Sequence, residues 1–217
     1  MKSTIALSGK AKSQSSRPRL LGRYESGRRR EALVLAAAQA VLVNGGYAQL
    51  TLRRVARQAH ISLALLQHYF RSKDELLRAV VHEVCRHYIQ ECDKLLSRQH
   101  GSPKAEFLTC IDYLIEDNRD PVSNTLFFEL WALACHDVHA NKLVAELYGY
   151  YRKYISRLIR NLRPTMSAHL IELRAAQIVA LIEGLTLFIG LNMPQRTIYR
   201  GLTADTRATV LRLATRG

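Results

Sequence analysis

The feature that most constrains this chain is residues 51–77, where two short helical patterns follow each other across a break. In the first pattern the apolar side chains recur at helical spacing and form one stripe, while the intervening arginines point elsewhere. This stripe consists of Leu52, Val55, Ala56 and Ala59. Thr51 precedes it at the position of a helix N-cap. The spacing predicts the first helix of a helix-turn-helix.

A second short helix is predicted after the break at His60 and Ile61. Ser62 is placed to cap it, and Leu66 and Phe70 are expected to face inward. The side chains that then face outward are Leu63, Ala64, Leu65, Gln67 and His68. We therefore expect the exposed side chains of this second helix to contact a binding partner.

The segment resembles the TetR family of one-component transcriptional repressors. The positions that match the family signature in order and spacing are Thr51, Val55-Ala56, Ala59, Ile61-Ser62, Leu66, His68-Tyr69-Phe70, Lys73 and Leu76-Leu77. Agreement at this many positions within one short window is a specific signal. Two positions depart from the signature. His60 replaces the usual turn glycine, and Gln67 replaces a common tyrosine with an amide that is able to pair with an adenine edge.

The resemblance implies a set of DNA-binding residues. Gln67 and His68 would meet base edges or phosphate, and Arg53 matches the position of an arginine that reaches a guanine. The leucines would meet thymine methyl groups, with packing inside the domain as the alternative. Helix N-termini and nearby polar groups would hold phosphates. The complete set is Thr51, Arg53, Ser62, Leu63, Ala64, Leu65, Gln67, His68, Tyr69 and Lys73.

Positive charge is concentrated at the start of the chain. The formal net charge is +14, and residues 1–30 contain nine basic side chains against Glu25 alone. A positive end beside a helix-turn-helix is typical of a protein that binds a polyanion, although a soluble tail would have the same composition. Residues 1–27 lack periodicity, so we expect a disordered basic arm, of the kind that lies in a DNA minor groove.

The remaining patterns are helical, with no strand alternation, so we predict an all-α fold. The first helix is expected to begin near Arg28 and to end at Asn44-Gly45-Gly46, a glycine-rich stop. A capping box formed by Ser72 and Glu75 opens the helix that leaves the DNA-binding unit. We predict a helix-turn-helix DNA-binding domain at residues 28–75 and a helical ligand-binding and dimerisation domain at residues 76–217.

The apolar helix predicted for residues 167–192 must be covered on every side. A second copy of the chain would cover it most simply, together with a short helix at residues 203–214. The resemblance implies that these two helices of each subunit form a four-helix interface of a homodimer. The run Ala180 to Leu185, with Phe128 to Trp131, is also similar to the subgroup of the repressor of choline-to-betaine metabolism.

The second domain also contains aromatic side chains with acids among them. Aromatic faces combined with carboxylates suit a cationic or amphipathic small-molecule effector. The candidate ligand-binding residues are Tyr113, Phe127, Phe128, Glu129, Trp131, Tyr148, Tyr151 and Glu183. Ordinary core packing is the competing interpretation for each of them. Glu183 needs a partner in so apolar a helix, and an arginine across a dimer would serve as well as a ligand.

Other functional classes find little support in the sequence. We expect a cytoplasmic protein with reduced thiols, because the cysteines show no CxxC spacing and no signal peptide or full-length membrane span is evident. The run at residues 82–86 lacks the second histidine of a zinc-protease motif, and we predict no metal, no cofactor and no enzyme activity. The alternatives to a sequence-specific regulator are a nonspecific nucleic-acid-binding protein and a small-molecule enzyme.

Overall fold

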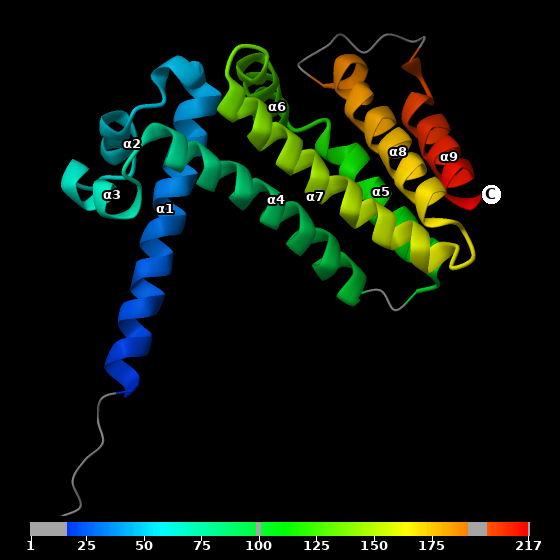
Figure 1. Cartoon of the computed structure of the whole chain (residues 1–217), viewed down its shortest axis with the longest axis horizontal. Coiled ribbons are helices and arrows are strands. Elements are labelled where there is room, and N and C mark those ends of the chain that lie inside the picture. The colour runs from blue at the N-terminus through cyan, green and yellow to red at the C-terminus, as the bar shows by residue number, and fades with distance from the viewer. Residues whose placement is uncertain (1–16, 99–100, 191–198, 217) are drawn as a thin grey trace, which may run out of the picture.

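The computed structural model describes residues 17–98, 101–190 and 199–216, and within these ranges the chain consists of helices joined by turns, without strands (Figure 1). The helices are α1 (Arg17–Gln49), α2 (Leu52–Gln58), α3 (Leu63–Tyr69), α4 (Lys73–Arg98), α5 (Pro103–Asp117), α6 (Pro121–Ala134), α7 (Val138–Leu162), α8 (Ala168–Ile189) and α9 (Leu202–Thr215). The all-α prediction is confirmed.

The helix-turn-helix forms as the sequence predicts. The Thr51 side chain accepts a hydrogen bond from the backbone N–H of Arg54 (3.2 Å) and caps α2. The Ser62 side chain accepts from the N–H of Leu65 (3.1 Å) and caps α3. Between them His60 adopts a left-handed backbone with φ of 55°. The turn therefore keeps the shape that a glycine would favour, although the residue is histidine.

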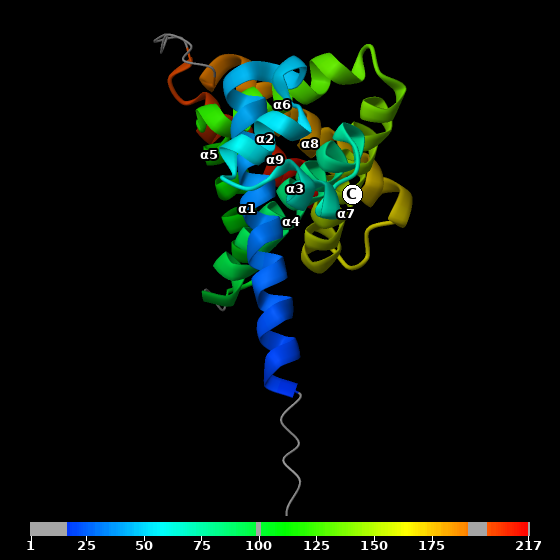
Figure 2. The same ribbon diagram turned by 90° about the vertical axis from the view of Figure 1, so that its left-hand side faces the viewer.

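The limits of α1 differ from the prediction. The helix begins at Arg17, so residues 17–27 belong to it and are not a disordered arm, whereas residues 1–16 lie outside the described ranges. Pro18 falls in the first turn, where its missing N–H costs nothing. Figure 2 shows the resulting N-terminal half of α1 projecting away from the other helices. The predicted glycine stop is confirmed, because Gly46 interrupts the helix with φ of 71°.

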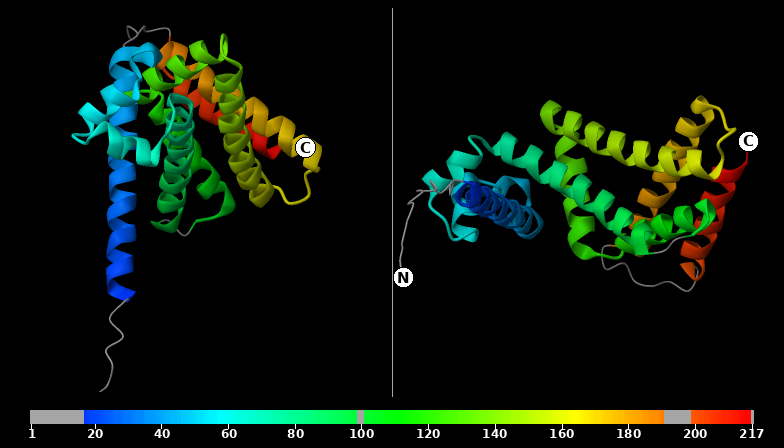
Figure 3. Two further views of the ribbon diagram at one scale, coloured as in Figure 1. Left: turned by 60° about the vertical axis from the view of Figure 1, so that its left-hand side comes forward. Right: turned by 90° about the horizontal axis from the view of Figure 1, so that it is seen from below.

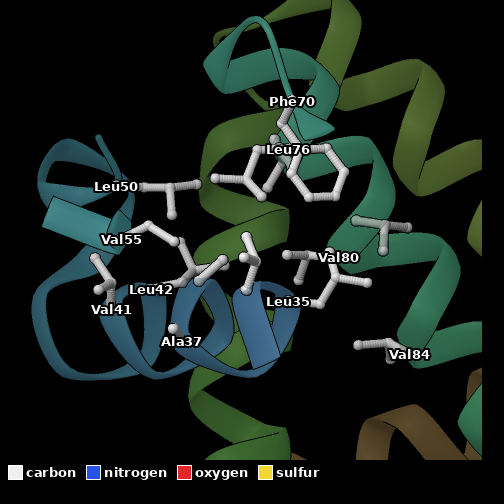
Figure 4. Close-up of a cluster of buried hydrophobic side chains, with 14 of the residues drawn as sticks. Leu35, Ala37, Val41, Leu42, Leu50, Val55, Phe70, Leu76, Val80 and Val84 are labelled. Carbon is white, nitrogen blue, oxygen red and sulfur yellow. The ribbon is translucent and has the colours of Figure 1, made fainter. Parts of the chain in front are cut away.

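The first unit, α1 to α3 with the start of α4, packs around a common core (Figure 4). Leu50, Val55, Leu66 and Leu76 have no exposed surface. Burying side chains of this size contributes about 1.5–3 kcal/mol each, which is what holds such short helices in place.

One segment of α1, Arg29–Gln49, is long and apolar enough to cross a membrane by length and composition alone. Its apolar face contains Val34, Ala38 and Leu42, which are buried in this core. Helices α2, α4 and α6 cover that face. The segment is therefore accounted for as a core helix of the first unit.

Helix α4 connects the two ends of the molecule (Figure 3). The predicted capping box at its start forms only in part. Ser72 accepts from the N–H of Glu75 (3.0 Å), but the Glu75 carboxylate accepts from the N–H of Arg71 (2.8 Å) instead of from Ser72. The far end of α4 packs on α5 and α7, so any tilt of α4 changes the position of α2 and α3 relative to the second unit.

The second unit is a bundle of α5 to α9 in which α7 and α8 lie along each other (Figure 1). Helix α8 is buried on one face and open on the other. Its open face carries Leu173, Leu181, Leu187 and Phe188, which are 47%, 39%, 51% and 43% exposed. The second half of this helix is apolar almost all round, as the sequence predicts, and its open face stays largely exposed within the described ranges, where Phe188 has the ring of Tyr199 beside it.

Candidate DNA-binding surface and effector cavity

Helix α3 presents the outward face that the sequence analysis expects. Ala64, Gln67 and His68 are exposed, and Leu66 beneath them is fully buried. Leu63 and Leu65 are half-buried, so each has part of its surface inside the unit and part available to a partner. A helix N-terminus capped by Ser62 also leaves backbone N–H groups free to bind a phosphate.

Helix α2 adds polar groups at its N-terminal end. Thr51 and Arg53 are exposed. Arg54 is exposed as well, but its guanidinium donates to the side-chain oxygen of Gln49 at the end of α1. Arg53 is thus the cation of this pair that is better placed to reach a base or a phosphate.

Lys73 and Tyr69 are half-buried, as Leu63 and Leu65 are, and both contact neighbouring residues. The Lys73 ammonium donates to the carbonyl of Tyr47 (2.7 Å) and lies 3.4 Å from the centroid of the Tyr47 ring. Partial burial lowers the Lys73 pKa, and nearby Asp74 opposes that effect. Tyr69 is half-buried with its ring edge against His68. Lys73 therefore joins α4 to the end of α1, a role that the sequence analysis does not anticipate.

Glu129 of α6 also binds Tyr47, at its backbone N–H instead of its carbonyl. Its carboxylate accepts the N–H of Tyr47 (2.9 Å) just after the break in α1. A side chain at Gly46 would come within 3.1 and 3.2 Å of the two carboxylate oxygens, so glycine allows this close approach. Glu129 consequently serves as a contact between the units and does not line the cavity described next.

A small cavity lies within the second unit, between α4, α5, α6, α7 and α8. Its volume is about 60 Å³, well below the ~300–1,000 Å³ of sites for drug-sized ligands, so a larger effector must push the helices apart. The lining residues are Cys85, Tyr88, Ile89, Cys92, Leu114, Asp117, Asn118, Asn124, Phe127, Leu147, Tyr150, Tyr151, Tyr154, Glu183 and Thr186.

Of the predicted ligand-binding residues, the structure brings Phe127, Tyr151 and Glu183 together in this lining. Two others lie directly behind it, since Trp131 Nε1 donates to the Tyr148 hydroxyl (2.8 Å) and that hydroxyl donates to Glu183 Oε2 (2.9 Å). The remaining aromatics, Tyr113 and Phe128, are not part of the lining. Tyr113 packs its ring near Tyr88 and Phe128 packs against Trp131.

Glu183 is the acid at one side of the cavity. Burial raises its pKa from 4.5 to about 7, and the negative charge of Asp117 adds to this, while the hydrogen bond from Tyr148 lowers it. The carboxyl is therefore poised to change its protonation state near neutral pH. A cation beside it would favour the ionised form.

Asp117 is a second acid in the lining, which the sequence analysis misses. It accepts hydrogen bonds from the hydroxyls of Tyr88 and Ser123. Burial raises its pKa, and these two hydrogen bonds oppose that effect. Helical spacing contained a signal for it, because Asp117 follows Cys110 and Leu114 on the buried face of α5.

The polar surface of the cavity also includes a hydroxyl without a partner. The Tyr151 oxygen is buried and forms no hydrogen bond with the described residues. Burial raises the pKa of this phenol well above its usual value. An unpaired buried hydroxyl costs stability unless a ligand or water binds it, and Tyr151 is one of the residues that line this cavity.

The cavity approaches the outer surface between α4 and α7. Cys85, Ile89 and Tyr150 line both the cavity and a surface depression that also contains His82 and Arg86. Tyr150 is 47% exposed, so one layer of side chains separates the cavity from solvent there. Within the described ranges, no group of three or more His, Cys, Asp or Glu side chains is arranged to hold a metal ion.

Comparison with known proteins matches both units. Residues 34–80 match the family model for bacterial regulatory proteins of the tetR family, and residues 107–214 match the C-terminal domain of the BetI-type transcriptional repressor. The chain belongs to the TetR family. This membership makes it a ligand-responsive, DNA-binding transcriptional regulator of the repressor type, in a family of regulators and not of enzymes.

Individual transcriptional regulators show the same likeness. The transcriptional regulator BetI of Escherichia coli O157:H7 is 26% identical over 166 residues, which are 76% of this chain and 83% of the relative. A putative transcriptional regulator of Pseudomonas aeruginosa PAO1 aligns with a TM-score of 0.71 at 22% identity, over 87% of this chain and 91% of that one. A TetR regulator of Haloarcula marismortui aligns with a TM-score of 0.66 at 18% identity, over 86% and 97%.

Proposed function

We propose that this protein is a cytoplasmic homodimer that represses transcription at a palindromic operator and leaves it when a small organic cation binds the cavity. The observation that carries the proposal is the placement of a buried acid, Glu183, in an aromatic cavity directly beside α4, the helix that positions α2 and α3. Binding there and DNA binding at α3 are thus joined through one rigid element.

The DNA-binding half of the proposal rests on the exposed face of α3. In the helix-turn-helix geometry this helix enters the major groove, where Gln67 is able to pair with an adenine and Arg53 with a guanine. Backbone contacts and the positive charge of residues 1–30 would supply most of the affinity. Two such helices, one from each subunit, would meet successive major grooves and favour a two-fold symmetric site.

The open face of α8 supports the dimer. At about 100° per residue, Leu173, Leu181, Leu187 and Phe188 fall on one side of α8, so together they form an exposed apolar surface. A second copy of α8 and α9 would bury it by two-fold symmetry.

The effector class follows from the lining of the cavity. Aromatic rings and two acids attract a positive charge, while the apolar remainder favours carbon next to it. The present volume excludes most such molecules, so binding requires the helices around the cavity to separate. That movement would tilt α4 and place the two α3 helices out of register with the operator.

Selection of random duplex DNA by the purified protein tests the operator claim. At about 150 mM salt, where loose electrostatic binding is weakened, we expect enrichment of a site with two related halves. Tight, salt-sensitive retention without any enriched sequence would instead support a nonspecific nucleic-acid-binding protein. Deleting residues 1–27 would then abolish binding, whereas a sequence-specific dimer would lose affinity but keep its preference.

A further inference from the structure

Two tyrosines occupy equivalent places between the two units. Tyr88 of α4 and Tyr148 of α7 each pack on both hydrophobic cores, the one around α1 to α4 and the one within α5 to α9. Each donates its hydroxyl to a cavity acid, Tyr88 to Asp117 and Tyr148 to Glu183. The cavity is therefore bounded by two tyrosine–carboxylate pairs whose rings also contact the other core.

Tyr88 lies next to α1 across a cleft. A cleft between the units is lined by Ala32, Leu35 and Ala36 of α1 and by Tyr88 and Asp117 from the side of the cavity. Tyr88 and Asp117 thus form the wall that the cavity and this cleft share. A shift of the Tyr88 ring therefore changes the shape of the cleft beside α1.

Tyr148 reaches α1 through α6. Its hydroxyl accepts from Trp131 of α6, and two residues before Trp131 the Glu129 carboxylate binds the N–H of Tyr47. Lys73, the first residue of α4, binds the carbonyl of Tyr47. The second pair is thus connected to the end of α1 and the start of α4 through α6, which contacts Tyr148 with Trp131 and Tyr47 with Glu129.

The chemistry of both pairs makes them sensitive to charge. A buried carboxylate is costly unless it is hydrogen-bonded, and each tyrosine supplies part of that compensation. A cation in the cavity is a stronger partner for either carboxylate than a neutral hydroxyl. Once a cation is bound, the carboxylate no longer depends on the hydrogen bond from the tyrosine hydroxyl. The tyrosine ring is then free to move with its helix.

We propose that the pairs Tyr88–Asp117 and Tyr148–Glu183 convert the charge of the bound effector into movement of α1 and α4. The inference rests on the proposed function, in that it requires a cationic effector and an operator-binding ligand-free form. The new claim is that operator binding by the ligand-free protein depends on both tyrosine hydroxyls. These hydroxyls position the helices and do not contact DNA.

Replacing each tyrosine by phenylalanine tests this inference without the natural effector. Tyr88→Phe and Tyr148→Phe keep the ring but remove the hydrogen bond, and each is expected to weaken ligand-free operator binding about tenfold. Tyr113→Phe is the matched control, because this tyrosine lies beside Tyr88 and has no hydrogen bond to a described residue. The control should bind the operator like the unchanged protein.

Operator affinity is measured by fluorescence anisotropy with labelled DNA, and thermal unfolding shows that each variant is folded. Trp131 fluorescence, with methylammonium to tetraethylammonium ions as probes, measures the cation response, which should be smaller in both variants. Unchanged operator affinity in the two folded variants, or an equal loss in Tyr113→Phe, would overturn the inference. If instead the effector is not a cation, the unchanged protein will show no response to any of these ions, which distinguishes failure of the proposed function from failure of this inference.

Discussion

Replacing Glu183 by glutamine should stabilise the fold above neutral pH and have a smaller effect in mild acid. The carboxyl is buried, and its pKa rises from 4.5 to about 7. Because the folded protein binds this proton more tightly than the unfolded chain, stability falls as pH rises from 4.5 to about 7 and is constant above that range. Glutamine has the same shape, still accepts the hydrogen bond from Tyr148, and carries no charge.

The magnitude follows from the two pKa values. Their difference corresponds to about 3 kcal/mol at pH 8, and the same linkage gives about 1 kcal/mol at pH 5. Glu183→Gln should therefore gain up to about 3 kcal/mol over the unchanged protein at pH 8 but only about 1 kcal/mol at pH 5. Glu146→Gln is the control, because Glu146 is an exposed acid that lies 3.5 Å from His82.

Urea unfolding at both pH values, at one fixed protein concentration, measures these differences. Glu146→Gln should change stability by less than about 0.5 kcal/mol at either pH. A Glu183→Gln variant that is destabilised, or whose gain is the same at pH 5 and pH 8, would refute the argument that burial of an ionised carboxylate is the source of the effect.

Three further predictions concern DNA, assembly and ligand entry. Gln67→Ala should relax base preference at one operator position, whereas Lys73→Ala should weaken binding to all sequences alike, because it removes the support of Tyr47; competition binding with single-base operator variants checks both. Leu187→Glu should convert the dimer to a monomer in analytical ultracentrifugation, since it places a charge in the proposed interface, and a persistent dimer would locate the interface elsewhere. Tyr150→Ala should speed labelling of Cys85 by a small cationic thiosulfonate, measured by peptide mass spectrometry; an unchanged rate would exclude Tyr150 as the barrier at the opening.

Local signals made much of the DNA-binding unit predictable. The caps at Thr51 and Ser62 and the break at Gly46 depend on residues that are neighbours in sequence, and the structure forms each of them. The buried faces of α2 and α3 follow from spacing of 3.6 residues per turn in the same way. The start of α1 was missed because serine, proline and glycine near it obscure a run of good helix formers.

The cavity was less predictable, because it depends on contacts between helices far apart in the sequence. Aromatic composition identified Phe127 and Tyr151 but equally suggested Phe128, which packs elsewhere. Glu129 follows Phe128 in the sequence, yet it faces Tyr47 of α1, since successive residues of a helix point about 100° apart. Asp117 lies in the last turn of α5, where helical spacing places it on the buried face, but its hydrogen bond with Tyr88 of α4 depends on tertiary packing.

The most direct test of the account measures DNA and cation binding to the same dimer. Operator affinity is determined with and without saturating alkylammonium ion, at constant ionic strength maintained with NaCl, and cation affinity is followed through Trp131 with and without operator. We expect the cation to weaken operator binding and the operator to weaken cation binding by the same factor, because the two equilibria are linked. Operator affinity that stays constant while Trp131 reports a fully occupied cavity would contradict the claim that this cavity controls DNA binding.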